Sequence, residues 1–440
     1  MQGVNTGRVS KPGAREPAAA GTLAALATLY LAQGLPFGFQ AHGLRGYLTE
    51  SGMDLKKVGL AGALAMPWTL KLLWAPLVDR YGSRRVGRRK SWIIPLQVLL
   101  ALACATVAMT PPSQGLTPLL VLILLMNLLA ATQDIAVDGL AIDLLKPHQL
   151  GRGNAAQVVG FKVGMLIAGG WLLWASPWIG WSGMFFVMSA LVLAALGATL
   201  MLREPESAGD GDERAAEGSP GSLRGVLRSL LEALKVPGAG WLLLFVGTYK
   251  LGESMVDAMF IPYLIGSGYT MSDIGKWIGT YGMVASIAGS LAGGELARRM
   301  PLLGAVGLAA VLRAAALSGP WYLASLGGKP PAAGVLTVSI LEHFFGGALT
   351  TAMFAFMMSR VRRSVGATHY TLLAGVETLG KTPGMLSGYV VAALGYRGLF
   401  ALGVALSVAF LGLLLPLRER PSRDAISSQA RRSYAGRGPG

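Results

Sequence analysis

The stretch Ala131-Thr132-Gln133-Asp134-Ile135-Ala136-Val137-Asp138-Gly139 places two carboxylates inside an apolar run that begins at Leu116. Four residues make about one helical turn, so Asp134 and Asp138 lie on one helix face. An acid facing lipid costs about 2.5–3.5 kcal/mol, so we expect both to face the interior of a helix bundle. Two such close carboxylates oppose joint ionisation, which makes a shared proton and proton coupling one hypothesis. The alternative is a structural acid site, capped by a basic neighbour or by hydrogen bonds.

The composition is that of a polytopic membrane protein. Of 440 residues, 53% are hydrophobic and only 14% are charged, against about 25% charged in soluble domains. A membrane helix needs about 20 apolar residues, and such windows recur along most of the chain. We therefore predict an all-α membrane protein with twelve transmembrane helices, near residues 21–47, 55–78, 91–110, 117–144, 151–176, 182–202, 240–265, 273–297, 302–326, 334–359, 367–394 and 397–417.

The basic residues indicate topology and argue against nucleic-acid binding. The formal net charge is +16, but a nucleic-acid site needs a soluble basic face. Here Lys and Arg concentrate in segments beside alternate spans, such as 80–90 and 203–235. By the positive-inside rule, both termini are cytoplasmic. Arginine-, glycine- and alanine-rich composition favours a bacterial inner membrane.

Chemistry-bearing motifs of enzymes are missing from the sequence. The single cysteine, Cys104, lies inside a predicted span and excludes an intrachain disulfide. The four histidines have no metal-ligand spacing, and there is no nucleophile elbow or phosphate-binding glycine loop. We expect neither a metal, nor a cofactor, nor an enzymatic activity.

Composition also divides the chain into five parts. We predict a cytoplasmic tail at 1–20, a six-helix bundle at 21–202, a linker at 203–239, a second six-helix bundle at 240–417 and a tail at 418–440. The linker is predicted from its abrupt change to charged, Gly- and Ser-rich sequence.

Traces of an internal duplication connect the two predicted bundles. Gly160-x-x-x-Gly164-Met165-Leu166 matches Gly380-x-x-x-Gly384-Met385-Leu386 at an offset of 220 residues, and Thr28-x-x-Leu31-Ala32-Gln33 matches Thr248-x-x-Leu251-Gly252-Glu253. A third match, near offset 219, pairs Asp54-Leu55-x-Lys57 with Asp273-Ile274-x-Lys276. Ordered matches favour two parallel six-helix repeats, the organisation of the major facilitator superfamily, with a binding site between them at the membrane midplane.

The loop after the second predicted span resembles that superfamily's signature. It reads Ala75-Pro76-Leu77-Val78-Asp79-Arg80-Tyr81-Gly82-Ser83-Arg84-Arg85, with Ala75 in place of the first glycine of Gly-x-x-x-Asp-Arg-x-Gly-Arg-Arg. The resemblance implies a cytoplasmic latch formed by Asp79, Arg80, Arg84 and Arg85. Asp143 is a candidate partner for Arg84, Arg85 or Arg88. The alternative is that the arginines only set topology.

A closer resemblance covers most of the membrane portion. Pro67-Trp68-x-x-Lys71-x-x-Trp74-Ala75-Pro76-x-x-Asp79, Gln133-Asp134-x-x-x-Asp138 and Gly151-x-Gly153-Asn154-x-x-Gln157 with Lys162-x-Gly164 look like the branch of the acetyl-coenzyme A transporter and the bacterial muropeptide permease. Thr248-Tyr249-Lys250-Leu251-Gly252-Glu253 and Ala367-Thr368-His369-Tyr370 with Glu377-x-x-Gly380-Lys381 look most like major facilitator superfamily domain-containing protein 3. The resemblance implies an acetyl-coenzyme A-like or anhydro-muropeptide cargo.

Charged residues on predicted helix faces supply the candidate cavity. Lys250, Glu253 and Asp257 share one face, either as an internal ion pair or as a switch. Gln33 stands at the matching place in the first span, before the flexible Gly34–Gly38, so the first and seventh helices are the expected cavity walls.

Other candidates carry alternatives of their own. Glu377 and Lys381 have the favourable i, i+4 order, so they either neutralise each other or face the cavity. Lys162, with Asn154 and Gln157, and Lys71 would suit phosphates or carboxylates, although Lys71 could instead snorkel. We expect Arg313 to be structural, with Glu342 as its partner, and His343 to be a packed core residue. His369, beside Tyr370, resembles a family position at the cavity.

These patterns favour a secondary transporter working by alternating access. We predict that it moves an anionic or zwitterionic organic solute, acetyl-coenzyme A-like, with proton coupling as a hypothesis. An anhydro-muropeptide proton symporter is the alternative. A non-transporting scaffold or sensor is a reading of another class, but it would usually carry a sizeable extramembrane domain. The expected partners are a small solute, the lipid bilayer and protons, with no nucleic acid, and the chain is expected to be a monomer.

Overall fold

The computed structural model describes residues 20–83, 85–110, 116–145, 150–202, 204, 239–360 and 366–415. Within these ranges the secondary structure is entirely helical. Helices satisfy their own backbone hydrogen bonds, which a chain surrounded by hydrocarbon requires. Large apolar side chains on the outside, including Met201, Trp178 and Met109, fit this setting because they would face lipid.

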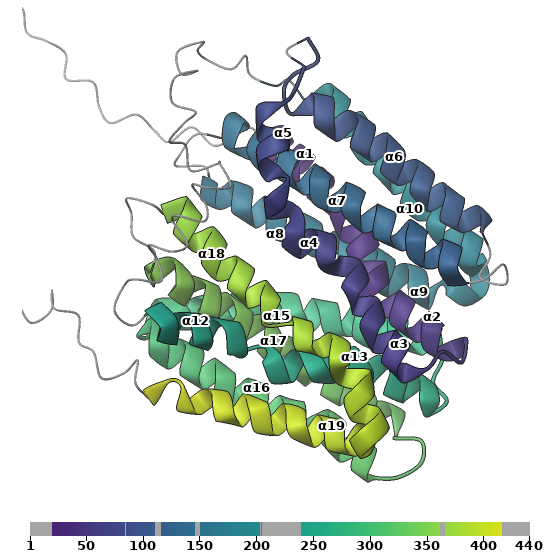
Figure 1. Ribbon diagram of the computed structural model, residues 1–440, viewed down its shortest axis with the longest axis vertical. Coiled ribbons are helices and arrows are strands. Elements are labelled where there is room, and N and C mark those ends of the chain that lie inside the picture. Colours follow the sequence, from purple (N-terminus) through teal and green to yellow (C-terminus); the bar gives the residue numbers. More distant parts are fainter. Residues whose placement is uncertain are drawn as a thin grey trace, which may run out of the picture.

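The helices before residue 202 form the first part of the molecule, drawn in purple and blue in Figure 1. They are α1 Ala20–Gly38, α2 Arg45–Glu50, α3 Leu55–Leu60, α4 Met66–Leu70, α5 Ala75–Arg80, α6 Lys90–Met109, α7 Leu116–Leu144, α8 Leu150–Leu166, α9 Leu172–Trp174 and α10 Ser176–Met201.

The helices from residue 239 onward, drawn in teal to yellow, form the second part. They are α12 Ala239–Thr248, α13 Leu251–Gly266, α14 Met271–Ile274, α15 Met283–Arg299, α16 Leu302–Ser325, α17 Ala332–Arg360, α18 Gly366–Leu379 and α19 Ser387–Gly412. The buried apolar side chains form four clusters, two within the first part and two within the second. Each part therefore has a core of its own.

Irregular turns interrupt several helices near the centre of the molecule. Lys71–Leu73 is a 3₁₀ turn between Pro67 and Pro76, and Thr382–Leu386 is another that contains Pro383. Proline lacks the backbone N–H that an α-helix needs, which explains both breaks. Between α12 and α13 the helix is broken at Tyr249 and Lys250. Further 3₁₀ or π-helical segments are Phe39–Leu44, Ala61–Ala65, Ile167–Trp171 and Gly275–Gly282.

Eight helical stretches are long and apolar enough to cross a membrane, among the residues that the structure describes. The all-helical membrane class is thus confirmed, while the division into twelve spans stays a prediction. The predicted spans 55–78 and 240–265 are broken into shorter helices, and 367–394 and 397–417 fall in one stretch, Leu373–Gly412. The predicted span 273–297 carries Gly, Ser and charged residues that lower its hydropathy.

Glycines let helices of the same part pack backbone to backbone. A Cβ on Gly160 of α8 would lie 2.2 Å from the backbone oxygen of Ala27 in α1. A Cβ on Gly380, after α18, would lie 2.1 Å from that of Gly247 in α12. Ala27 and Gly247 are separated by the same 220 residues as Gly160 and Gly380. The two contacts are thus equivalent under the offset found in the sequence, which supports the predicted duplication.

Other glycines bring the two parts together at one end of the molecule. A Cβ on Gly388 of α19 would lie 2.1 Å from the backbone oxygen of Leu55 in α3, and one on Gly279 would lie 1.9 Å from that of Gly169. In Figure 1, α2 and α3 meet α13 at this end, whereas α5 and α18 lie at the other end. Since no side chain separates these backbones, the parts are tightly closed here.

Candidate transport site

A polar cavity lies between the two parts and is divided into two adjoining pockets of about 640 and 570 Å³. The larger pocket is lined by residues of α1, α7 and α8 on one side and of α13, α15, α16 and α17 on the other. Volumes of this size suit a small organic molecule. Among the predicted residues, the cavity lining includes Asp134, Gln157, Lys162, Lys250, Glu253, Asp257 and Lys381.

The two acids of α7 have different partners. Asp134 is buried and forms an ion pair with Lys71, whose ammonium also lies over the ring of Trp68. Asp138 instead accepts hydrogen bonds from Tyr30 Oη at 2.7 Å and from Gln157 Nε2 at 3.0 Å. Asp134 therefore has a cationic partner, whereas the hydrogen-bond partners of Asp138 are neutral.

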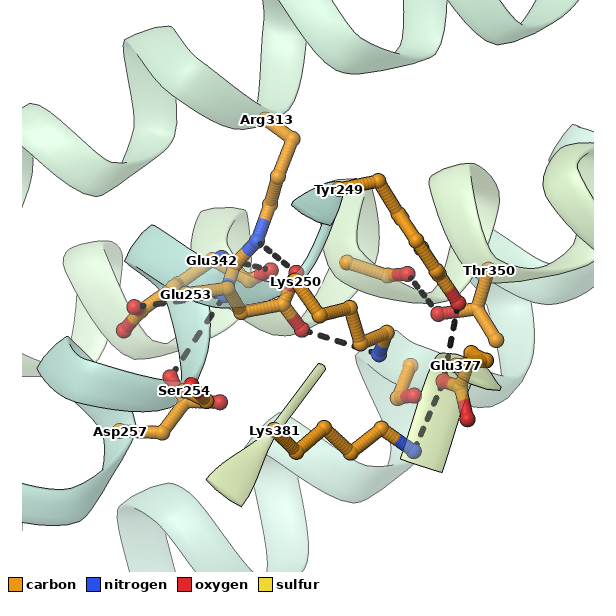
Figure 2. A network of polar contacts seen from close by, with 12 residues as sticks. Tyr249, Lys250, Glu253, Ser254, Asp257, Arg313, Glu342, Thr350, Glu377 and Lys381 are labelled. Atoms are coloured by element: carbon orange, nitrogen blue, oxygen red, sulfur yellow. Dashed lines mark hydrogen bonds and ion pairs between the residues drawn. The ribbon is translucent and has the colours of Figure 1, made fainter. Parts of the chain in front are cut away.

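A charged network connects α13 with α16 and α17 (Figure 2). Lys250 Nζ lies 3.1 Å from Glu253 Oε1, and Arg313 Nε donates to Glu253 Oε2 at 3.2 Å. Arg313 Nη2 is also 3.6 Å from Asp257 Oδ1 and 3.5 Å from Glu342 Oε1. Three carboxylates thus converge on one buried guanidinium, which neutralises charge that would be costly at membrane depth.

Sequence reasoning underestimated Arg313. The expected partner Glu342 is present, and Arg313 Nη1 additionally donates to the Glu342 backbone oxygen at 2.6 Å. However, Arg313 also lines the larger pocket and reaches Glu253 and Asp257. The side chain of Asp257 is 47% exposed, so this network opens onto the cavity. An arginine in the middle of an apolar span was the available signal. His343 also lines this pocket, and its Nδ1 is 2.9 Å from the Ser339 backbone oxygen.

A second acid–base pair comes from α18 and the turn after it. Glu377 Oε1 lies 2.8 Å from Lys381 Nζ and accepts a hydrogen bond from Tyr249 Oη at 3.0 Å. Glu377 is 4% exposed and Lys381 is 43% exposed at the side chain, so the lysine reaches the cavity while the glutamate is buried behind it. Figure 2 shows this pair near Lys250.

Two basic residues connect the two parts through neutral groups. Lys162 Nζ of α8 donates to Ser290 Oγ of α15 at 2.9 Å and approaches Ser286 Oγ at 3.4 Å. Arg45 of α2 donates from Nη1 to the backbone oxygen of Asp257 at 3.0 Å and lines the smaller pocket. Arg45 is not among the residues that the sequence predicted for the site.

The remaining predicted cavity residues fall into two groups. Gln33 and Gln133 are completely buried, and their amide atoms have no hydrogen-bond partner in the part of the chain that the structure describes. The side chains of Asn154, His369 and Tyr370 lie outside the described residues.

The structure describes only part of the predicted latch. Arg84 and the side chains of Asp79 and Arg80 lie outside the described residues, and Arg85 is exposed. Asp143 Oδ2 is 3.2 Å from Nε of Arg89, which was not among its predicted partners.

Glu204 adds a contact at the same end that sequence reasoning missed. It accepts hydrogen bonds from the backbone N–H groups of Arg89 and Lys90, at 2.9 and 3.0 Å. A carboxylate at the start of α6 is favourable because helix N-termini have free N–H groups and partial positive charge. Glu204 belongs to the segment predicted as a linker.

Comparisons with known proteins identify the type of molecule. The family described as acetyl-coenzyme A transporter 1 matches residues 22–174. The anhydromuropeptide permease of Escherichia coli (strain K12) is 32% identical over 400 residues, covering 90% of this chain and 79% of the permease. Putative transporter AmpG 4 of Rickettsia conorii is 27% identical and covers 89% of this chain and 95% of its own.

Solved structures agree on the fold. A mutant of the nucleoside transporter NupG superimposes with a TM-score of 0.68 at 13% identity, covering 90% of this chain and 99% of NupG. A bacterial homologue of the human lysosomal transporter Spinster, in an inward-facing and occupied conformation, gives 0.67 at 15% identity, with 91% and 98% covered. Together with the similarity to the permease, these findings show that the chain is a multi-pass integral membrane protein and not an enzyme. The chain belongs to the acetyl-coenzyme A transporter/AmpG family of major facilitator superfamily transporters.

Proposed function

We propose that this protein is a proton-coupled secondary transporter that carries an anhydro-muropeptide, or a closely related carboxylated solute, by alternating access. The observation that carries the proposal is the polar cavity between the two parts, whose lining includes the basic residues Lys162 and Lys381 and the acids Asp134, Glu253 and Asp257. Ionisable groups at membrane depth are expensive and typically mark a solute or proton pathway.

The architecture in this proposal is two six-helix bundles, 21–202 and 240–417, with both termini in the cytoplasm. The equivalent glycine contacts of Ala27 with Gly160 and of Gly247 with Gly380 support two repeats. The parts are closed at the end that carries the loops near residues 52 and 268, which the charge distribution puts outside. The cavity would then open towards the cytoplasm of a bacterium, the inward-facing state of an alternating-access cycle.

Two cargoes were predicted, and the relatives favour one of them. The acetyl-coenzyme A transporter family matches only residues 22–174, whereas the similarity to the anhydromuropeptide permease covers 90% of the chain. A match of that length includes most of both parts of the molecule. We therefore favour the anhydro-muropeptide over acetyl-coenzyme A. The resemblance of the motifs after residue 248 to major facilitator superfamily domain-containing protein 3 remains a prediction.

Asp138 is the proton-carrying residue in this proposal. Asp134 is ion-paired with Lys71, so a cation already balances its charge. Asp138 has neutral partners, and both of their hydrogen bonds end on Oδ1. We assign the proton to Oδ2. A proton bound there would remove a negative charge in a site where charge is costly.

A thermal-shift screen of the purified protein tests the choice of cargo. Anhydro-muropeptides and coenzyme A thioesters are compared at two pH values, because a ligand that binds the folded state raises the unfolding temperature. The proposal expects protection by anhydro-muropeptides, stronger at the lower pH, where Asp138 holds its proton. Protection by coenzyme A thioesters alone would show that the cargo is a coenzyme A thioester and not an anhydro-muropeptide. Protection by neither ligand would favour a scaffold or sensor.

A further inference from the structure

Most basic groups of the cavity already have an acidic partner. Lys71 pairs with Asp134, Lys250 with Glu253, and Lys381 with Glu377. Arg313 contacts three carboxylates, whereas Arg45, which lines the smaller pocket, donates to the backbone oxygen of Asp257. The four ion-paired cations, Lys71, Lys250, Lys381 and Arg313, are therefore neutralised by the protein itself. Their number alone does not make the cavity attractive to an anion.

Lys162 differs from these residues. Its ammonium lines the larger pocket, and its partners in the described part of the chain are the hydroxyls of Ser290 and Ser286. Ser290 Oγ in turn donates to the Ser286 backbone oxygen at 2.8 Å, so its hydroxyl proton is engaged there and its oxygen accepts from Lys162. The serines thus satisfy hydrogen bonds of the ammonium but not its charge. An ammonium at membrane depth without a counter-ion is costly, and a bound anion would relieve that cost.

The position of Lys162 suits contact with a solute. It projects from α8 in the first part towards α15 in the second, across a pocket of about 640 Å³. Phe37, Trp68 and Phe161 line the same pocket and pack against one another, with ring centroids 5.5–5.8 Å apart. These rings form an apolar wall beside the charged group. A solute with a carboxylate and an apolar or sugar-like body would meet both.

We propose that Lys162 binds a carboxylate of the transported solute and makes the protein selective for the anionic form. This inference rests on the proposed function, because it names the group that recognises that cargo. When the carboxylate binds, it takes up donors that Lys162 otherwise directs at Ser290 and Ser286. Solute binding therefore changes a hydrogen bond that connects the two parts of the molecule.

The test compares two ligands on the purified full-length protein. One is an anhydro-muramyl peptide with free carboxylates, and the other is the same peptide with its carboxylates amidated. Affinities are measured by isothermal titration calorimetry for the wild type, Lys162→Met, Lys162→Arg and the control Lys57→Met. Lys57 is exposed on α3 and lines neither pocket.

A charge-assisted hydrogen bond corresponds to about 10- to 100-fold in affinity, so the wild type should prefer the acid by that factor. Lys162→Met should bind acid and amide equally, at the wild-type affinity for the amide, which also shows that the variant is folded. Lys162→Arg should restore the preference, and Lys57→Met should leave it unchanged. If Lys162→Met prefers the acid as strongly as the wild type does, the assignment of Lys162 is wrong while the proposed function stands. If the wild type binds neither peptide, both fail.

Discussion

Arg313 of α16 and Glu253 of α13 form a buried ion pair, with Arg313 Nε 3.2 Å from Glu253 Oε2, although 60 residues separate them in the sequence. Asp257 and Glu342 lie against the same guanidinium. One side chain therefore connects three helices of the second part and balances much of the acidic charge beside the cavity.

Replacing Arg313 with Met should destabilise the protein strongly. The change leaves Glu253, Asp257 and Glu342 without their shared cation, and breaking a buried pair in this way costs about 3–5 kcal/mol. Chemical unfolding of the purified protein in detergent measures the loss. Arg299→Met is the control, since Arg299 is exposed and its ion pair with Glu295 lies at the surface. Equal stability of both variants would show that the network is not needed for folding.

The pair of Lys71 and Asp134 should be energetically coupled. Lys71→Met leaves Asp134 buried without its cation, and Asp134→Asn leaves Lys71 without its anion. We expect each single change to cost more stability than the double change, with a coupling energy of about 1–3 kcal/mol in a double-mutant cycle. Additive effects would mean that Lys71 instead snorkels away from Asp134.

Asp138→Asn should separate proton coupling from solute binding. The amide cannot release a proton, but it keeps the size of the side chain beside Tyr30 and Gln157. In proteoliposomes we expect loss of uptake driven by a pH gradient, while exchange of labelled for unlabelled solute continues. Glu295→Gln, an exposed change at the end of α15, should alter neither. Gradient-driven uptake by Asp138→Asn at the wild-type rate would exclude Asp138 as the proton carrier.

The glycine contacts between the two parts should hold one end closed. In Gly279→Val the new Cβ would lie 1.9 Å from the Gly169 backbone oxygen, which is too close for any side chain. The two parts must therefore separate at this contact. We expect a longer distance between spin labels at positions 51 and 268 in a Cys104→Ser background, measured by pulsed electron paramagnetic resonance. Gly197→Val is the control, because its Cβ would meet open space. An unchanged distance in Gly279→Val would show that this contact does not set the conformation.

The sequence predicted helices, membrane location and contacts between residues about one turn apart well. Apolar windows about 20 residues long identify helices because of bilayer thickness. The spacings of Lys250 with Glu253 and of Glu377 with Lys381 allowed ion pairs as one of two alternatives, and the structure contains these pairs at 3.1 and 2.8 Å. Residues three or four apart are neighbours in helical geometry, and the pairs form here even though Lys250 precedes α13 and Lys381 follows α18.

Contacts between helices could not be predicted in the same way. Lys71 and Asp134 are 63 residues apart, and Lys162 is 128 residues from Ser290. Which cation meets which acid depends on how the helices are rotated and packed. For this reason the sequence did not show that most basic residues of the cavity are already paired with acids. It also did not predict that Arg313 contacts Glu253 and Asp257. The shared position of Asp134 and Asp138 on one face was predictable, but their different partners were not.

Uptake of a labelled anhydro-muropeptide into proteoliposomes tests the central claim most directly. The measurement compares wild-type protein with empty liposomes, with and without a proton gradient that is acidic outside the liposomes. We expect saturable uptake above the external concentration only when protein and gradient are both present. Dissipating the gradient with an ionophore should return uptake to simple equilibration. Uptake no faster than in empty liposomes, under conditions where the same preparation binds the solute, would contradict transport and leave a receptor on a transporter fold.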